Sequence, residues 1–492
     1  MAKSTYRSIA KANTILGSVQ ILTIIIGIIR SKLVALLLGP VGVGLMGLYQ
    51  STIDLVRSAT NMGISTSAVR DVAIAKGTNN ELELQKTQSV ISKIVWVTGA
   101  LGMGVMLIGA PWLSEITFGN REYTWAFRIL SIIPLIAQLT VQHNVTLQGT
   151  RAMKRLASAS IWGGLVGLFI NVPMFYIWGE DAIIPALIIV AVASLAIAWY
   201  NASKLNISSV VTTWSEVFTR GRSMVKMGFL IGLTGLLDMT AIYIVKIYVQ
   251  KWGELAEVGL YTAGFAIVQS YVNLVFRAIG TDYYPRLSAI SNNKEEYCDA
   301  INKQFEILIL VLTPMVLIFM SFSSELLHLL YSTKFQPAKM MICWMAFGML
   351  FRAYSWCPGF MFLAKSDSKL YFILYILAFA LELLLYLSGY YYLGLTGIGI
   401  AFGLQYVITT TYTLVIIRHR YSFKYGWRQN RLMLISVLSG FLVLITIYAI
   451  SARWGYFVFF AIILGVSFFC YKELNKRLNI VSLIKSKKVI KK

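Results

Sequence analysis

The sequence predicts an all-α polytopic membrane protein with about fourteen transmembrane helices. Only 13% of the 492 residues are charged, whereas 57% are hydrophobic, and the mean hydropathy is +0.69. A soluble fold has about 25% charged residues, so this chain has too few to cover a water-exposed surface. Apolar runs of bilayer length also follow one another along the whole chain. A soluble enzyme is therefore excluded.

The apolar runs give the expected helices in order. The first run follows a basic N-terminus and is too long for a signal-peptide core, so we interpret it as an uncleaved first span. All the runs exceed the roughly ten alternating residues of a membrane β-strand, which favours helices. The predicted spans are 12–38, 41–64, 89–110, 123–147, 156–178, 182–200, 228–249, 258–280, 304–324, 339–364, 370–393, 395–417, 432–451 and 453–471.

The distribution of Lys and Arg predicts the orientation. With the N-terminus placed in the cytoplasm, 33 of the 44 basic residues lie on the cytoplasmic side and eight on the other. Both termini are therefore predicted to be cytoplasmic. The net charge of +23 is thus explained by basic residues on the cytoplasmic side of the membrane, and no nucleic-acid partner is expected. The longest internal loops, at 65–88, 201–227 and 281–303, leave no room for a catalytic domain.

An internal repeat predicts two six-helix lobes in the same orientation. Val43-Gly44-Leu45 recurs 215 residues later as Val258-Gly259-Leu260, and Arg70-x-x-Ala73-Ile74 recurs as Arg286-x-x-Ala289-Ile290. Asn79-Asn80-Glu81 and Asn292-Asn293-Lys294-Glu295 follow in the same order. An offset of six spans gives a parallel pseudo-repeat, which is typical of transporters. The expected divisions are an N-terminal lobe at 1–200, a cytoplasmic linker at 201–227, a C-terminal lobe at 228–420, and two extra spans with a basic tail at 421–492.

Polar residues on the second and eighth spans lie on single helical faces. Gln50, Asp54, Arg57 and Asn61 follow the spacing i, i+4, i+7, i+11. They line a cavity, or else Asp54 and Arg57 form a private ion pair. On the eighth span, Gln269, Asn273 and Arg277 repeat the pattern. Arg277 either faces the cavity or anchors the helix at the cytoplasmic surface.

Charged residues also occupy the first and seventh spans. Arg30 and Lys32 face a water-filled cavity if the first helix continues to Leu38, and reach the outer surface if it ends at Ile29. Asp238 and Lys246 share one face of the seventh span. Asp238 is equally consistent with an ion pair and with a protonatable coupling site.

Two more charges lie at the centres of the tenth and eleventh spans. Arg352 is expected to be functional, and Pro358 is expected to break its helix locally. Glu382 is either an ion-pair partner or a proton site. Charges at bilayer depth normally face protein or water.

Basic residues exceed acidic ones among these candidates, which favours an anionic ligand. Arginine matches phosphate oxygens in a bidentate manner. No metal-ligand cluster, P-loop or nucleophile motif occurs in the sequence, so no catalytic residue, metal ion or cofactor is expected. The candidate substrate-binding residues are Arg30, Lys32, Arg57, Lys246, Arg277 and Arg352, and the candidate ion-coupling or ion-pair residues are Asp54, Asp238 and Glu382.

Several short motifs resemble bacterial polysaccharide exporters of the multidrug/oligosaccharidyl-lipid/polysaccharide superfamily. They are Leu38-Gly39-Pro40-x-Gly42-x-Gly44, Tyr284-Pro285-Arg286-Leu287 and Leu329-Leu330-Tyr331-Ser332-x-Lys334-Phe335, followed by Trp344, Gly348, Arg352, Gly359, Ala364-Lys365 and Tyr371. Over about residues 1–420 the chain is most similar to Wzx-type flippases of lipid III and O-antigen. A related fourteen-span branch flips lipid II and has arginines on its first, second and eighth spans. Arg30, Arg57 and Arg277 occupy comparable spans here.

The resemblance implies a flippase of the bacterial inner membrane for surface polysaccharide biosynthesis. It would move an undecaprenyl-diphosphate-linked oligosaccharide from the cytoplasmic to the outer leaflet by alternating access. A coupling cation (H⁺ or Na⁺), membrane lipids and the polysaccharide polymerase machinery are the other expected partners. The alternatives are a lipid II flippase and a cation-coupled multidrug exporter. A membrane polymerase or ligase is a third hypothesis, against which the short external loops argue.

Overall fold

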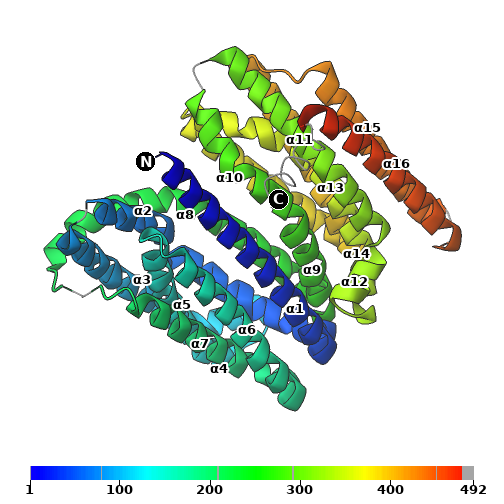
Figure 1. Cartoon of the computed structure of the whole chain (residues 1–492). Helices are drawn as coiled ribbons and strands as arrows, with labels where there is room; N and C mark the ends of the chain where they lie inside the picture. The colour runs from blue at the N-terminus through cyan, green and yellow to red at the C-terminus, as the bar shows by residue number, and fades with distance from the viewer. Residues whose placement is uncertain are drawn as a thin grey trace, which may run out of the picture. The chain divides into compact units, whose positions relative to one another are not determined.

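The computed structural model describes residues 2–478, except 62, 79, 208–209, 291–292 and 450–451. Side chains are described from Val19 onward, with some further exceptions, among them Arg277 and Arg453. All regular secondary structure in this part of the chain is helical (Figure 1). The basic tail beyond Leu478 lies outside the described residues.

The chain divides into two compact units. The first ends at Gly259 and also includes Leu330–Ser332, and the second contains the remaining residues. The first unit contains α1 (Ala2–Asn61), α2 (Ile64–Gly77), α3 (Glu81–Phe118), α4 (Thr124–Leu130), α5 (Ile132–Gly149), α6 (Met153–Trp178), η1 (Gly179–Ala182), α7 (Ile183–Ser203) and α8 (Trp214–Trp252). The boundary between the units falls within α9 (Leu255–Ile267).

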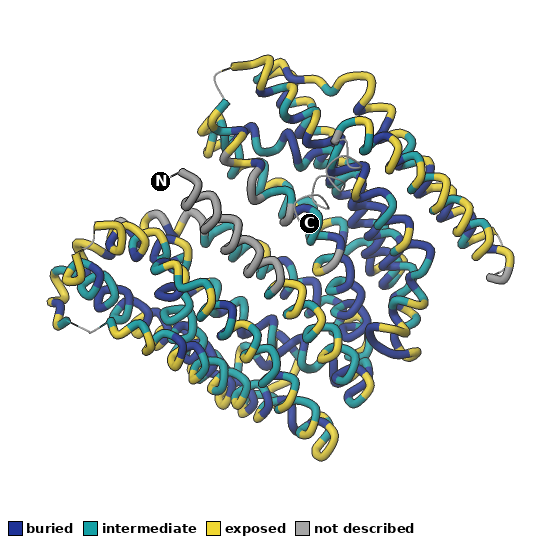
Figure 2. Tube along the Cα trace, viewed as in Figure 1, coloured by how far each residue is buried: buried dark blue, intermediate teal, exposed yellow. Residues whose placement is uncertain are grey.

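The second unit continues from α9 to the end of the described chain. Its elements are η2 (Val268–Val272), α10 (Asn273–Ala289), α11 (Lys294–Ser321), α12 (Ser323–Leu330), η3 (Thr333–Ala338), α13 (Lys339–Ala364), α14 (Ser368–Tyr421), α15 (Trp427–Ala449) and α16 (Ala452–Leu478). Figure 2 shows α13 as a largely buried helix, whereas α16 exposes much of its surface.

Ten helical segments of the described chain are long and apolar enough to cross a membrane, which confirms the predicted all-helical membrane architecture. Three of them, Val19–Asn61, Met153–Ser203 and Ser368–Tyr421, have 43, 51 and 54 residues. That is about twice the ~20 residues that one crossing needs. Each is interrupted, by Gly39 (φ 63°), by η1 and by Gly394 (φ 58°) respectively. α13 is a further largely apolar helix of 26 residues, with the charged Arg352 in its interior.

Gly44 and Gly259 bring the backbones of α1 and α9 into direct contact. A Cβ atom on Gly44 would lie 2.2 Å from the carbonyl oxygen of Leu255, and one on Gly259 would lie 1.9 Å from that of Pro40. Each glycine therefore faces the carbonyl group four residues before the other glycine. This reciprocal contact, which tolerates no side chain, is a physical reason for the repeated Val-Gly-Leu motif.

The repeated asparagines are helix N-caps. Asn80 Oδ1 accepts hydrogen bonds from the backbone N–H groups of Leu82 and Glu83 at the start of α3, at 3.0 and 3.4 Å. Asn293 Oδ1 accepts from the N–H group of Glu296 at the start of α11, at 3.4 Å. The motif thus recurs because both helices need a side-chain acceptor for their first N–H groups.

The segment 201–227, expected as a linker, contains a long piece of helix. α8 begins at Trp214, and a capping box fixes this start. The N–H group of Glu216 donates to Thr213 Oγ1 at 3.3 Å, and that of Thr213 donates to the Glu216 carboxylate at 3.0 Å. The Thr-x-x-Glu spacing is a recognised start signal for a helix. The expected loop 65–88 likewise contains most of α2.

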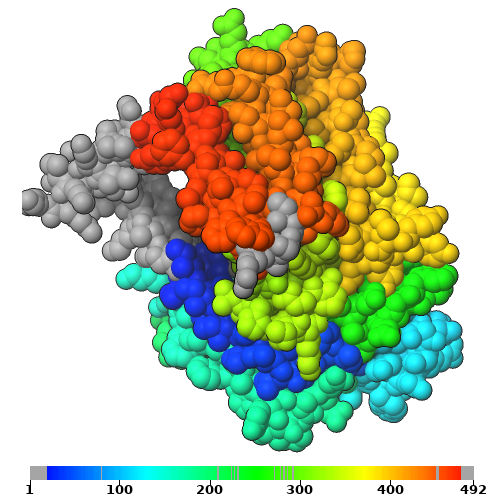
Figure 3. Space-filling view, turned by 90° about the vertical axis from the view of Figure 1, so that its right-hand side faces the viewer, coloured from blue at the N-terminus to red at the C-terminus, as the bar shows by residue number. Residues whose placement is uncertain are grey.

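α15 and α16 pack against α11 and against each other, and Figure 3 shows the pair together on one face of the second unit. A buried charge cluster connects them. Arg477 of α16 pairs with Glu306 of α11 and, at 3.0 Å, with Glu473. Gln429 of α15 donates to Glu306 at 2.8 Å. The side chains of Glu306, Glu473 and Arg477 are 8%, 11% and 13% exposed, so these charges compensate one another largely away from solvent.

Candidate functional site

Asp54 is the centre of a polar cluster on α1. Arg57 Nη1 lies 3.2 Å from Asp54 Oδ1, and Gln50 Nε2 donates to Asp54 Oδ2 at 3.1 Å. The three residues share a face because they are three or four positions apart on one helix. The side chains of Arg57 and Asp54 are 35% and 34% exposed. The predicted ion pair is therefore present, and its arginine remains partly accessible.

Lys246 of α8 adds a second positive charge to this cluster. Its Nζ donates to the carbonyl oxygen of Gly47 on α1 at 2.9 Å, and the residue is only 8% exposed. The Asp54 carboxylate interacts electrostatically with it. α8 is also held by Tyr243, whose hydroxyl is hydrogen-bonded to that of Thr117 on α3 at 2.7 Å. One carboxylate thus faces two cations, and the cluster has a net positive charge.

Asn61 and Asp238, also in the first unit, extend the set of candidates along α1 and α8. Asn61 Oδ1 is buried and has no hydrogen-bond partner among the described residues. Asp238 is exposed on α8, eight residues before Lys246, which is about 12 Å along the helix. Its role in ion coupling or ion pairing stays a prediction.

Arg30 and Lys32 lie within a continuous stretch of α1 helix, which extends to the kink at Gly39. The alternative in which the helix ends at Ile29 is therefore wrong. Arg30 Nη1 lies 3.5 Å from the position that a Cβ atom on Gly167 of α6 would occupy. The absence of a side chain at Gly167 leaves room for the guanidinium group against α6.

Arg352 of α13 lies over two aromatic rings in the second unit. Its guanidinium carbon is 5.0 Å from the ring centroid of Phe276 and 5.6 Å from that of Tyr406. Such contacts hold a cation through the negative faces of the rings. The expectation that Pro358 breaks this helix is wrong, because α13 continues to Ala364.

Glu382 belongs to a short hydrogen-bonded chain within α14. Gln405 Nε2 donates to Glu382 Oε2 at 3.4 Å, and the hydroxyl of Tyr386 donates to Gln405 Oε1 at 3.2 Å. The two halves of α14 on either side of Gly394 are thereby connected. Whether Glu382 transfers protons stays a prediction.

The polar stripe of the eighth span includes a π-helical segment that the sequence analysis missed. Gln269 lies in η2, a π-helix of five residues, and Asn273 begins α10. Gln269 Oε1 is buried without a hydrogen-bond partner in the described part of the chain. π-helical turns are frequent at functional sites. The side chain of Arg277 lies outside the described residues.

A basic cavity on α8 was also missed, because its residues were used only to predict topology. Arg222, Lys226 and Phe229 line a cavity of about 490 Å³. Near it, Arg220 Nη1 lies 2.7 Å from the Glu83 carboxylate of α3. This hydrogen bond raises the pKa of Arg220 above its usual value, so the arginine is charged at any physiological pH.

Long apolar helices that carry charged side chains are typical of polytopic membrane transporters. The chain belongs to the polysaccharide biosynthesis protein family, whose sequence profile matches residues 33–340. This membership confirms the resemblance to Wzx-type flippases and identifies a transporter family rather than an enzyme family.

Similar proteins include the lipid III flippase of Escherichia coli (strain K12), which is 21% identical in an alignment of 391 positions that covers 76% of this chain and 89% of the relative. A putative O-antigen transporter of Shigella flexneri is 24% identical in an alignment of 392 positions that covers 75% of this chain and 88% of the relative.

Solved structures share the fold. The lipid II flippase MurJ in an inward closed conformation matches with a TM-score of 0.66 and 12% identity, over 95% of this chain and 99% of MurJ. An inward-facing multidrug resistance MATE family transporter of the MOP superfamily matches with a TM-score of 0.64 and 15% identity, over 82% and 96%.

Proposed function

We propose that the protein is a flippase for a lipid-linked oligosaccharide in surface polysaccharide biosynthesis. Its substrate is an undecaprenyl-diphosphate-linked, O-antigen-like oligosaccharide, moved from the cytoplasmic to the outer leaflet of the bacterial inner membrane. Membership of the polysaccharide biosynthesis protein family and the similarity to a lipid III flippase support this proposal.

The observation that carries the proposal is the net positive charge of the Asp54 cluster. Arg57 and Lys246 together carry one more charge than Asp54 neutralises. Guanidinium and ammonium groups bind phosphate oxygens strongly where water is partly excluded. Arg57, which is partly exposed, would bind the diphosphate of the substrate while the polyprenyl chain stays in the lipid.

The other parts of the mechanism follow from the same proposal. Fourteen spans form two parallel six-helix lobes and an additional C-terminal pair, with both termini in the cytoplasm. Alternating access would move the headgroup across, with Asp238 or Glu382 coupling transport to H⁺ or Na⁺. The polysaccharide polymerase machinery would receive the substrate at the outer leaflet.

Two related functions are the alternatives. A cation-coupled drug exporter would favour cationic substrates and therefore an excess of carboxylates, whereas the Asp54 cluster has an excess of cations. A lipid II flippase would also use cations for a diphosphate. These two flippase substrates are distinguished by the sugars of the lipid that accumulates when the protein is absent.

Complementation tests the proposal. A strain without its own flippase should regain surface polysaccharide and lose the accumulated lipid-linked intermediate when it expresses this chain. The deletion strain of the native host should accumulate that intermediate with its oligosaccharide, and its sugar composition identifies the substrate. Drug resistance without any change in lipid-linked sugars would contradict the proposal and favour the exporter.

A further inference from the structure

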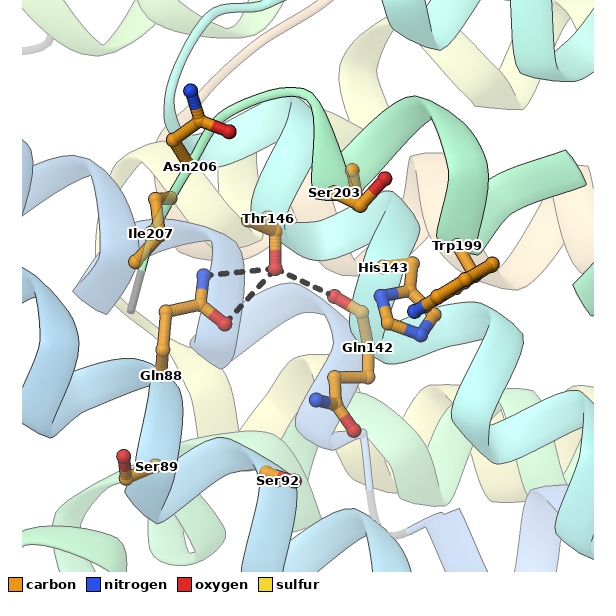
Figure 4. A pocket seen from close by; sticks show the side chains of 11 residues that line it. Gln88, Ser89, Ser92, Gln142, His143, Thr146, Trp199, Ser203, Asn206 and Ile207 are labelled. Atoms are coloured by element: carbon orange, nitrogen blue, oxygen red, sulfur yellow. Dashed lines mark hydrogen bonds between the residues drawn. The ribbon is translucent and has the colours of Figure 1, made fainter. Parts of the chain in front are cut away.

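A polar cavity of about 500 Å³ opens between the ends of three helices in the first unit, away from the Asp54 cluster. It is lined where α3 begins and where α5 and α7 end (Figure 4). Gln88 of α3 and Thr146 of α5 form one wall, with the amide of Gln88 donating to the threonine hydroxyl at 2.8 Å. This bond fixes the spacing of the two helices beside the cavity.

Three other lining side chains have hydrogen-bonding groups that remain available to a ligand. Gln142, His143 and Asn206 line the cavity, and none of these side chains has a hydrogen-bond partner in the part of the chain that the structure describes. They come from α5 and from the turn after α7. Trp199 of α7 adds a flat aromatic surface, and this residue is 58% exposed.

An apolar groove continues from the polar cavity. It has a volume of about 470 Å³ and shares Ser92, Gln142, His143 and Trp199 with the polar cavity. Its remaining lining is apolar, from α3, α5 and α7: Trp96, Leu139, Val192, Leu195 and Ala196.

The groove lies further from the ends of the three helices than the polar cavity does. Trp96 lies eight residues after Gln88, Leu139 seven before Thr146, and Val192 eleven before Ser203. At 1.5 Å per residue these separations are about 10–16 Å, all directed away from the same helix ends. The combined site has a polar end near the helix ends and an apolar end nearer the middle of the helices.

We propose that this site binds a neutral glycolipid, with a sugar ring in the polar cavity and its hydrocarbon chain in the groove. No Lys, Arg, Asp or Glu is among the described residues that line either cavity, so a phosphate headgroup would find no counter-charge. Amide and hydroxyl groups instead match the hydroxyl groups of a sugar, and an indole face packs against the C–H groups of a sugar ring.

This inference does not depend on the proposed translocation. The site differs from the Asp54 cluster in residues and in charge, so glycolipid binding and substrate flipping are measured separately. A protein that fails the complementation test would still be expected to bind the glycolipid.

Photolabelling tests the inference. The full chain is reconstituted in nanodiscs of phosphatidylethanolamine and phosphatidylglycerol, with an alkyl glucoside that has a diazirine in its alkyl chain. Mass spectrometry should find the label on the groove segments of α3, α5 and α7. Gln142→Ala and Trp199→Ala should each reduce this labelling about five- to tenfold, as expected for the loss of one or two polar or stacking contacts.

Matched controls separate the site from general lipid contact. Gln148→Ala changes an exposed glutamine on the same helix, and Trp162→Ala changes a tryptophan that is 56% exposed, and neither residue lines these cavities. Both controls should leave labelling unchanged. Asn206→Gly removes the amide in the turn after α7, where the backbone has a φ of 50°, so it reports on the sugar end if a helix variant fails to fold.

Two results would overturn the inference. One is equal labelling by a probe with the same chain and a phosphocholine headgroup, because the groove would then select only for hydrocarbon. The other is a loss of labelling in the cavity variants no larger than in the controls. Preference for the glucoside, lost in Gln142→Ala, Trp199→Ala and Asn206→Gly, supports it.

Discussion

Arg57→Ala provides the sharpest test of the proposed substrate site. The Arg57–Asp54 pair is about one-third exposed and lies at i,i+3, so its loss should cost only about 0.5 kcal/mol of folding free energy. Asp54 would keep the hydrogen bond from Gln50 and the electrostatic interaction with Lys246. The variant should therefore insert and fold normally.

Transport should respond far more than stability. A charge-assisted contact to a phosphate group contributes about 1.5–3 kcal/mol, so its loss weakens substrate binding about 10- to 150-fold. Arg57→Lys keeps the charge but loses the bidentate geometry and should be intermediate. The assay is flipping of a lipid-linked oligosaccharide in proteoliposomes, with protein amount and thermal stability measured in parallel.

A double variant separates the ligand role from the structural role. If Arg57 serves only to neutralise Asp54, then Asp54→Asn combined with Arg57→Ala should restore transport. If Arg57 binds the substrate, the double variant should be as inactive as Arg57→Ala alone. Restored transport, or full transport by the single alanine variant, would refute the proposed contact.

Three further predictions concern packing, the C-terminal helices and energy coupling. Gly44→Ala should lower the free energy of unfolding by about 1–3 kcal/mol, because its methyl group would overlap a carbonyl oxygen. Gly27→Ala is the control, because its methyl group would meet nothing within 4 Å. Thermal unfolding should show a loss of stability for the first variant and none for the second. Arg477→Ala should cost about 1.5–3 kcal/mol, because the buried Glu306 would keep only the hydrogen bond from Gln429 and a longer ion pair with Arg428. Glu306→Gln in the same background should recover part of this loss in the same assay. Each negative charge moved outward through 100 mV gains about 2.3 kcal/mol, so a membrane potential should drive transport in vesicles. Asp238→Asn should weaken the response to an ion gradient more than substrate binding, and transport indifferent to potential and gradients would contradict this prediction.

The sequence predicted the helical membrane class because that prediction needs only composition and the length of apolar runs. It also located repeated motifs whose reasons are local, such as the caps at Asn80 and Asn293. The pair of glycines at positions 44 and 259 was visible as a repeat, but their reciprocal contact was not. Contacts between residues 215 positions apart depend on how helices cross, which no local pattern encodes.

The site was predicted less completely than the fold. Charges three or four positions apart on one helix, such as Asp54 and Arg57, are readable from spacing alone. The junction of Gln142 and Trp199 combines residues from separate helices, and which helices pack together is not encoded in any local pattern. The π-helical turn around Gln269 was also missed, because a single turn of five residues is too short to show a periodicity of its own.

The two cations of the Asp54 cluster differ in exposure, and they would therefore contribute to the proposed function in different ways. Lys246 is 8% exposed and already donates to the backbone of α1, so under the proposed function its charge would act on the ligand through space rather than by contact. Arg57 directs one N–H group at Asp54, which also accepts a hydrogen bond from Gln50. A guanidinium has five N–H groups, so Arg57 has others with which to bind a ligand. An anion that reaches this cluster would thus contact Arg57 while Lys246 offsets its charge. The carboxylate between them holds both cations in place when no anion is bound, which keeps two like charges close together within the membrane.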